Sequence, residues 1–206
     1  MTYQLQKYKE EEELIKNIFE EVNGFFGSDV NYKDINIIFI PNRKTFDSYL
    51  ERKTDEWEVA VSNNKRGIII LDRDNYEKES CHKYSEEEYN SVLKHEIVHA
   101  IVFIHFKLYF PNWLVEGLAI YLSEQIYQKQ KPIKFEKFIS YWDYHDKDIY
   151  KESGFVVKIL LEKYGKKKFI KLLNSLKENE SEKFFNKEFE KVYNFGLNYP
   201  SFNKLI

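Results

Sequence analysis

The chain has 206 residues, of which 43% are hydrophobic and 17% are aromatic. This length and apolar content predict one folded domain with a buried core, and they exclude a disordered or linker-like chain. The 32 Lys and Arg residues against 34 Asp and Glu leave a formal net charge of -2. No strong positive field is available to attract polyanions, so neither nucleic acid nor a membrane is expected as a partner.

Disulfides, a signal peptide or a membrane span in a sequence would indicate a cellular compartment. Cys81 is the single cysteine, so no internal disulfide can form. Residues 1–13 are polar and then acidic, whereas a signal peptide has a basic start and then an apolar stretch. The most apolar stretch, Ile97 to Phe106, is shorter than the roughly 18 residues that a membrane span requires. The sequence therefore predicts a cytoplasmic protein.

The first part of the chain alternates helical and strand patterns. Apolar residues from Leu14 to Val22 recur at helical spacing, and Asn23-Gly24 then predicts a left-handed helix stop. The further elements expected are a strand over Ile35–Ile40, a helix over Thr45–Arg52, and strands over Trp57–Ser62 and Gly67–Leu71 joined by a turn at Asn63–Arg66. These runs predict a small sheet.

The rest of the chain predicts helices. Ser85 and Glu88 form a capping-box pattern at the start of a long buried helix that runs to Leu108 and is ended by Pro111. Further helices are expected over Trp113–Tyr127, Ser153–Tyr164, Lys166–Leu176 and Glu182–Tyr193. We therefore expect a single α+β domain, with the sheet and the long helix in residues 1–110 and a mostly helical lobe in residues 111–206.

The long helix contains the motif His95-Glu96-Ile97-Val98-His99. Residues four apart on a helix differ by about 40° and about 6 Å, so both imidazoles project from one face and can bind one Zn²⁺. Glu96 points to the side of this pair, where a carboxylate can reach a water on the metal without being a ligand. Burying these polar groups on an otherwise apolar helix would be costly without a partner such as a dication.

A catalytic zinc site needs a third protein ligand and an open fourth position. Glu116 is the best candidate for that ligand, because it lies in an apolar helical segment expected to fold back against the first helix. Its neighbours Trp113, Leu114 and Leu118 indicate burial, and a buried unpaired carboxylate is costly. Gly117 beside it would let the two helices approach closely.

The run from His95 to Tyr121, with Glu-Gly-Leu-Ala-x-Tyr preceded by Pro-x-Trp-Leu, resembles the gluzincin zinc metallopeptidases, specifically the bacterial peptidase MA-like domains. The resemblance extends more loosely to Tyr150–Gly165 and to Gly67–Leu71, and covers about half of the chain. It implies a zincin-like fold, with His95, His99 and Glu116 as zinc ligands and Glu96 as general base. It also implies that Gly67–Leu71 is an edge strand that binds extended peptides. The Gly-x-Met-Glu-Asn sequence of the aminopeptidase branch is absent.

These features together predict a zinc-dependent peptidase, specifically an endopeptidase, whose partner is a peptide or protein substrate. The developing oxyanion needs a donor besides the metal, and the candidates are Tyr150, Tyr121 and His145. Tyr150 is preferred because it precedes the helix that the resemblance places across from the metal. Two alternatives fit the same residues: a zinc-stabilised binding or regulatory module without turnover, and a zinc hydrolase of a non-peptide amide. No inhibitory or regulatory protein partner is identified by the sequence.

Overall fold

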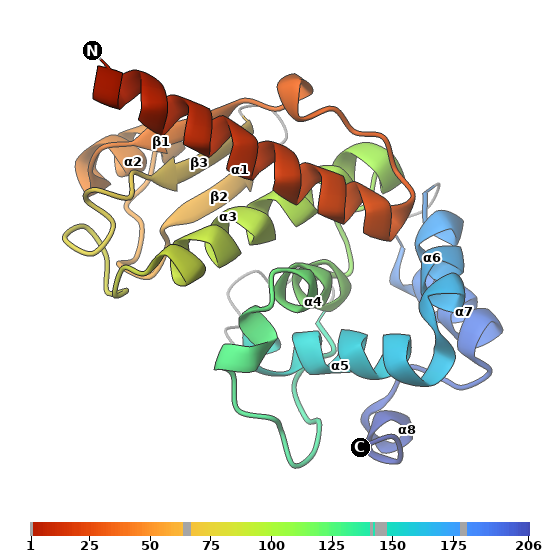
Figure 1. The fold of residues 1–206 in the computed structure, drawn as a ribbon. Coiled ribbons are helices and arrows are strands. Elements are labelled where there is room, and N and C mark those ends of the chain that lie inside the picture. Colours follow the sequence, from red (N-terminus) through yellow and green to blue (C-terminus); the bar gives the residue numbers. More distant parts are fainter. Residues whose placement is uncertain (1, 64–66, 141, 143–147, 178–180) are drawn as a thin grey trace. The chain divides into compact units, whose positions relative to one another are not determined.

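The computed structural model describes residues 2–63, 67–140, 142, 148–177 and 181–206. The chain separates into two compact units, Met1–Ile101 and Val102–Ile206. The sequence predicted a single domain whose helical lobe begins at residue 111. The first unit contains a three-stranded sheet with helices, and the described part of the second unit contains helices without strands (Figure 1). The expected α+β class is therefore confirmed.

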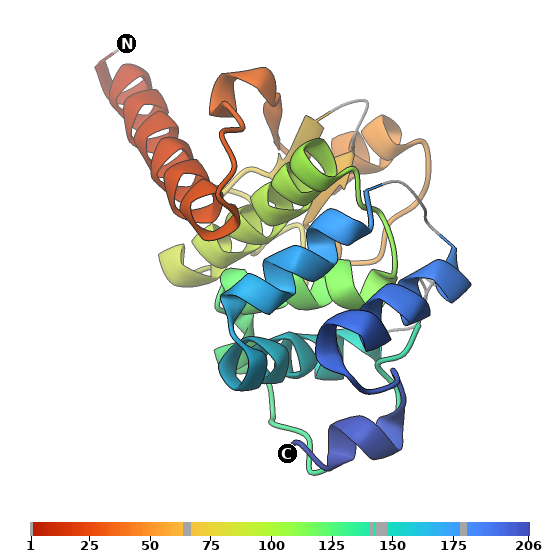
Figure 2. The same cartoon turned by 90° about the vertical axis from the view of Figure 1, so that its right-hand side faces the viewer.

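The first unit is a sheet flanked by helices. Its elements are α1 (Thr2–Phe26), η1 (Tyr32–Asp34), β1 (Ile37–Ile40), α2 (Arg43–Leu50), β2 (Ala60–Asn63), β3 (Gly67–Leu71) and α3 (Glu86–Ile101). Helices α1 and α3 lie on one side of the sheet and α2 lies on the other (Figure 2). The buried face of α1 consists of Ile18, Phe19, Val22 and Phe26.

The sheet order is β1-β3-β2, so β3 is the central strand. It pairs in parallel with β1 and antiparallel with β2. The expectation that Gly67–Leu71 is an edge strand open to a peptide is therefore wrong. The physical reason is visible in its composition: four consecutive apolar residues, Ile68 to Leu71, are all buried, as expected for a strand covered on both faces.

Gly67 marks the start of this central strand, with φ of +86°. A Cβ atom at this position would lie 2.1 Å from the carbonyl oxygen of Asn36. That carbonyl accepts a hydrogen bond from the Ile68 N–H at 2.8 Å. Only glycine satisfies both the left-handed backbone and the close approach.

The boundaries of α1 and α2 differ from those expected. Helix α1 continues through Asn23-Gly24 to Phe26 and ends at Gly27, which has the left-handed φ of +67°. The Gly27 N–H closes the helix by donating to the Asn23 carbonyl at 2.7 Å. Helix α2 begins two residues earlier than Thr45, because the Asn42 side chain caps it by accepting from the Thr45 N–H.

The beginning of α3 follows the predicted capping pattern, but its end does not. Ser85 Oγ accepts from the Glu88 N–H at 3.1 Å. After Ile101 the chain forms a π-helical turn, η2 (Val102–Phe106), and Lys107 then takes a left-handed φ of 56°. The helical run therefore ends ahead of Leu108, and Pro111 does not end it but stands at the N-cap of the next helix.

In the second unit, helices that follow one another along the chain pack against each other, as α4 does on α5, α5 on α6 and α6 on α7. After η2 come α4 (Asn112–Leu122), η3 (Gln125–Gln128), α5 (Ile149–Tyr164), α6 (Lys166–Ser175), α7 (Glu182–Tyr193) and α8 (Tyr199–Asn203). The predicted helix over Trp113–Tyr127 is split, because Glu124 adopts a left-handed φ of 67° after α4 ends. Helix α8 is an element that the apolar pattern did not predict.

Helices α4 and α5 pack against each other through glycines. A Cβ atom at Gly117 would lie 2.6 Å from the Ser153 carbonyl oxygen, and one at Gly154 would lie 2.5 Å from Ile120 Cγ2. An aromatic cluster covers the N-terminal turn of α4, where the fully buried Trp113 ring contacts Phe138 and Phe185 edge to face. The glycines and the aromatic rings together fix α4 within its unit.

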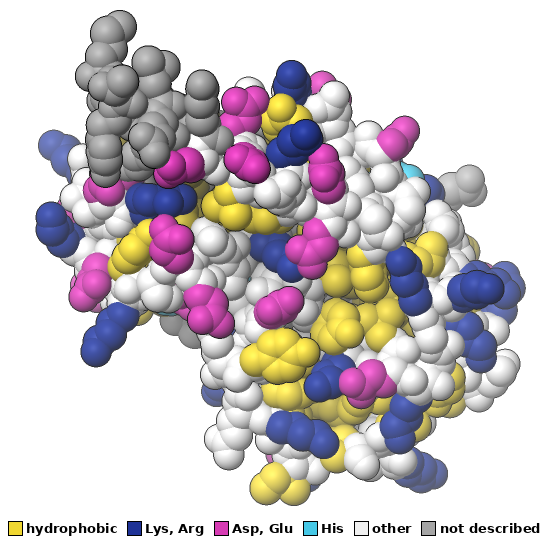
Figure 3. Space-filling model, in the orientation of Figure 1, with side chains coloured by type: hydrophobic (Ala, Val, Ile, Leu, Met, Phe, Trp, Pro, Cys, Tyr) yellow, Lys and Arg dark blue, Asp and Glu magenta, His cyan; other side chains and the backbone are white. Residues whose placement is uncertain are grey.

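Charged side chains of both signs are interspersed on the face shown in Figure 3, with apolar patches between them. Within the described ranges, every helix is too short or too polar to cross a bilayer.

Candidate metal centre

Helix α3 carries the His-Glu-x-x-His motif and is fixed within the first unit by polar contacts at separate points. The Tyr89 hydroxyl donates to the Leu71 carbonyl of the central strand at 3.0 Å, in a buried position. Lys94 forms an ion pair with Glu21 of α1 at 2.7 Å. These contacts, together with the apolar face of α3, hold the motif on a rigid element.

The two histidines of the motif project from one face of α3, as their spacing predicted. His95 is 9% exposed and His99 is half-buried. Their Nε2 atoms lie 3.0 Å apart, and their ring centroids lie 4.7 Å apart. Two nitrogen ligands about 2.0–2.1 Å from one tetrahedral Zn²⁺ would be separated by about 3.3 Å, so the observed spacing is close to that of a ligand pair.

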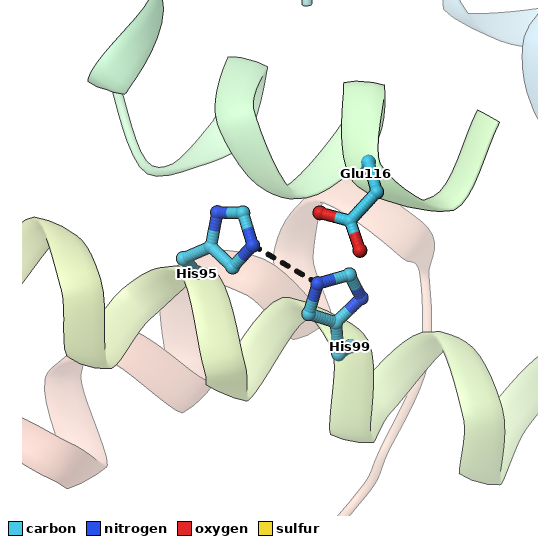
Figure 4. Close-up of side chains that lie close together, drawn as sticks. All are labelled: His95, His99 and Glu116. Carbon is cyan, nitrogen blue, oxygen red and sulfur yellow. Dashed lines mark hydrogen bonds between the residues drawn. The ribbon is translucent and has the colours of Figure 1, made fainter. Parts of the chain in front are cut away.

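The third predicted ligand, Glu116, lies in the middle of α4 with its Oε2 atom buried. Ligand atoms of His95, His99 and Glu116 all lie within 4.8 Å of one another. Figure 4 shows the Glu116 carboxylate directed toward the two imidazoles. The three predicted ligands therefore form one group that could hold a metal ion.

The donor set consists of two imidazole nitrogens and one carboxylate oxygen. This combination suits Zn²⁺ and is typical of catalytic sites with three protein ligands, which leave the fourth position for water or substrate. Hard cations such as Mg²⁺ and Ca²⁺ prefer all-oxygen sets, so the two histidines disfavour them. The residues present therefore fit a zinc ion.

Glu96 lies next to His95 on α3 and is 9% exposed. One residue along an α-helix corresponds to a rotation of about 100°, so Glu96 projects from α3 to one side of the face that carries His95 and His99. The described His, Cys, Asp and Glu residues give a single candidate metal group, and Glu96 is not part of it. The role of Glu96 as general base stays a prediction.

The structure gives the position and burial of two of the three candidates for the oxyanion donor. Tyr150 lies half-buried in the first turn of α5. Tyr121 lies half-buried near the end of α4, and burial raises the pKa of its phenol. His145 lies outside the described residues. The choice of Tyr150 stays a prediction.

One buried carboxylate, Glu152 in the first turn of α5, was not among the residues to which the sequence assigned a role. It is 8% exposed and accepts hydrogen bonds from the backbone N–H groups of residues 136–138. A sequence signal for its burial exists, since Ile149 and Val156 lie at i−3 and i+4 and place Glu152 on the apolar side of the helix.

Comparison of the chain with protein-family models, curated proteins and solved structures finds no match. The interpretation of the site therefore depends on the residues and their geometry.

Proposed function

We propose that the protein is a zinc-dependent peptidase with a zincin-like fold, of the gluzincin type, that cleaves internal peptide bonds. The observation that carries this proposal is the grouping of His95, His99 and Glu116 ligand atoms within 4.8 Å, beside a buried glutamate on the same helix as the histidines. This combination supplies both metal ligands and a proton acceptor.

Each residue has a separate role in the proposed reaction. His95, His99 and Glu116 would hold the zinc ion and leave one position open. Bound zinc would act as a Lewis acid that polarises the scissile carbonyl and lowers the pKa of water to about 7. Glu96 would accept the proton of the attacking water and deliver it to the leaving nitrogen, and Tyr150 would donate a hydrogen bond to the oxyanion.

An extended substrate needs a strand edge to bind, and the central strand β3 cannot provide one. In the described sheet the outer strands are β1 and β2, and β2 also packs against α3. We therefore propose that the substrate backbone binds along β2 (Ala60–Asn63). Backbone pairing would make cleavage depend on an extended conformation more than on a particular side chain.

The test of the proposed function compares Glu96→Gln with Glu116→Gln. Glu96 is not needed for coordination, so Glu96→Gln should keep the zinc content and the fold while lowering peptide cleavage by a factor of about 10²–10⁴. Glu116→Gln should lower zinc content, thermal stability and activity together, because a neutral amide is a weaker ligand than a carboxylate. Zinc is measured by elemental analysis and cleavage with a broad peptide library.

Two results would contradict the peptidase. One is Glu96→Gln cleaving peptides as fast as wild type. The other is wild type that binds one zinc per chain and cleaves no peptide, in which case a zinc-stabilised binding module would be the better description.

A further inference from the structure

The segment from Phe135 to Ser140 in the second unit has no regular secondary structure, yet side chains bind the backbone of residues 135–139. The Phe135 N–H donates to Asn203 Oδ1 at 2.6 Å, and its carbonyl accepts from Asn203 Nδ2 at 2.9 Å. The Ile139 N–H donates to the Tyr199 hydroxyl at 3.3 Å. Loops usually leave such groups to water, so this segment is held unusually firmly.

Glu152 provides the centre of this arrangement. The backbone N–H groups of Glu136, Lys137 and Phe138 donate to its carboxylate at 2.9–3.2 Å. Because Glu152 is 8% exposed, these bonds replace the water that the carboxylate has lost. Oε2 accepts from all three N–H groups and Oε1 accepts from Glu136 alone. A glutamine amide could therefore keep the bonds to one oxygen, but its N–H₂ group would face the Glu136 N–H and the charge that strengthens these bonds would be lost.

The bound segment reaches α4 at two points, both on Trp113. The Phe138 ring packs edge to face on the Trp113 indole, with centroids 5.4 Å apart. The Ser140 carbonyl accepts from the Trp113 N–H at 3.4 Å. Trp113 is fully buried and lies three residues before Glu116, on the neighbouring turn of the same helix face. The segment therefore sets the position of the turn that leads to Glu116.

We propose that Glu152 is a positioning residue for the metal centre. By holding residues 136–138 it fixes the N-terminal turn of α4, and thereby the direction in which the Glu116 carboxylate points. It touches neither metal nor substrate. This inference rests on the proposed function, because it assigns Glu152 a role only if Glu116 is a metal ligand.

The chain offers a matched control for testing Glu152. Glu188 in α7 is also 8% exposed, but its carboxylate is bound by the Lys191 ammonium at 3.2 Å, where Glu152 is bound by loop N–H groups. Glu152→Gln and Glu188→Gln therefore remove equally buried carboxylates, and only the first weakens the hydrogen bonds that hold residues 136–138.

The experiment measures Zn²⁺ affinity by competition with a chromogenic chelator and ligand geometry by the visible spectrum of the Co²⁺ form. Glu152→Gln should weaken Zn²⁺ binding about 10-fold, the lower range for outer supporting residues, and change the Co²⁺ spectrum. Glu188→Gln should match wild type in both. Asn203→Ala removes the two hydrogen bonds to the Phe135 backbone, so it should weaken Zn²⁺ binding in the same direction but by less. It replaces Glu152→Gln in the test if that variant does not fold.

The outcomes separate this inference from the proposed function. Wild-type Zn²⁺ affinity and Co²⁺ spectrum in Glu152→Gln, or in Asn203→Ala if the first variant is unfolded, would overturn the positioning role and leave the metal site intact. Equal losses in Glu152→Gln and Glu188→Gln would also overturn it, since a general loss of packing would then explain both. Wild type that binds no Zn²⁺ would overturn the metal site and the positioning role together.

Discussion

His82 lies between two hydrogen-bond acceptors. Its Nδ1 atom is 3.3 Å from a Glu88 carboxylate oxygen, and its Nε2 atom is 3.0 Å from the Trp57 carbonyl oxygen. A neutral imidazole has one N–H and can serve only one of them, whereas the imidazolium serves both. The hydrogen bond to Glu88 therefore raises the pKa of His82, with a contribution from the Trp57 carbonyl, against burial and the charge of Arg43.

This arrangement makes part of the stability depend on pH. The pKa of His82 is raised above its ordinary value of 6.5 in the folded state, so its contribution is fully present below about pH 6.5 and is lost as pH rises through the folded-state pKa. We expect the difference in melting temperature between wild type and His82→Gln to be largest near pH 6 and to shrink toward pH 9. Thermal denaturation across this range measures it, and a difference independent of pH would count against the imidazolium.

Some residues of the site were predictable and others were not, for a physical reason. The convergence of His95 and His99 follows from helix geometry alone, because four residues make about one turn. The partners of Glu152 lie 14–16 residues away along the chain and are backbone groups, which carry no residue identity. No motif can encode them, and only the apolar positions around Glu152 indicate that it is buried.

At the level of elements, one helix was predicted closely because its signal lies within a single segment. Glu182–Tyr193 was predicted with the boundaries observed for α7, since its apolar period and the Ser181 cap lie within one segment. The place of β3 in the sheet depends on pairing with strands elsewhere in the chain, and there the prediction was wrong. The missed helix α8 has five residues, too few to show a helical period.

Replacing a helical glycine by alanine tests packing, because the change in the free energy of unfolding should have opposite signs at Gly117 and at Gly24. Alanine usually favours a helix by up to about 1 kcal/mol over glycine. At Gly117, however, the new methyl group would clash with the Ser153 carbonyl oxygen and with Val157 Cγ2, 2.8 Å away. We expect Gly117→Ala to lower the free energy of unfolding by about 1–3 kcal/mol, because α4 and α5 must separate.

The control for this variant is Gly24→Ala in α1, where nothing lies within 4 Å of the added methyl group. Its backbone is helical, so the substitution should raise the free energy of unfolding by a few tenths to about 1 kcal/mol. Urea denaturation followed by circular dichroism measures both variants. Equal effects of the two substitutions would mean that the α4–α5 approach is not as close as described.

For the whole molecule, the proposed zinc site implies a stability that depends on free metal. A ligand that binds only the folded state stabilises it by about 2.7 kcal/mol when its concentration is 100 times its dissociation constant. For a chain of this size, each kcal/mol shifts the melting temperature by about 2–4 °C. Saturating zinc should therefore produce a shift large enough to measure without any substrate.

We expect a chelator to lower the melting temperature of the zinc-loaded wild type by about 5–10 °C and Zn²⁺, but not Mg²⁺, to restore it, because two imidazoles favour the borderline cation over the hard one. The control is a His95→Ala, His99→Ala double variant, which should melt at the same temperature with and without chelator. Differential scanning calorimetry measures both proteins. A chelator effect of equal size in the double variant would place the stabilising metal elsewhere, and no effect in wild type would argue against a metal bound in the folded state.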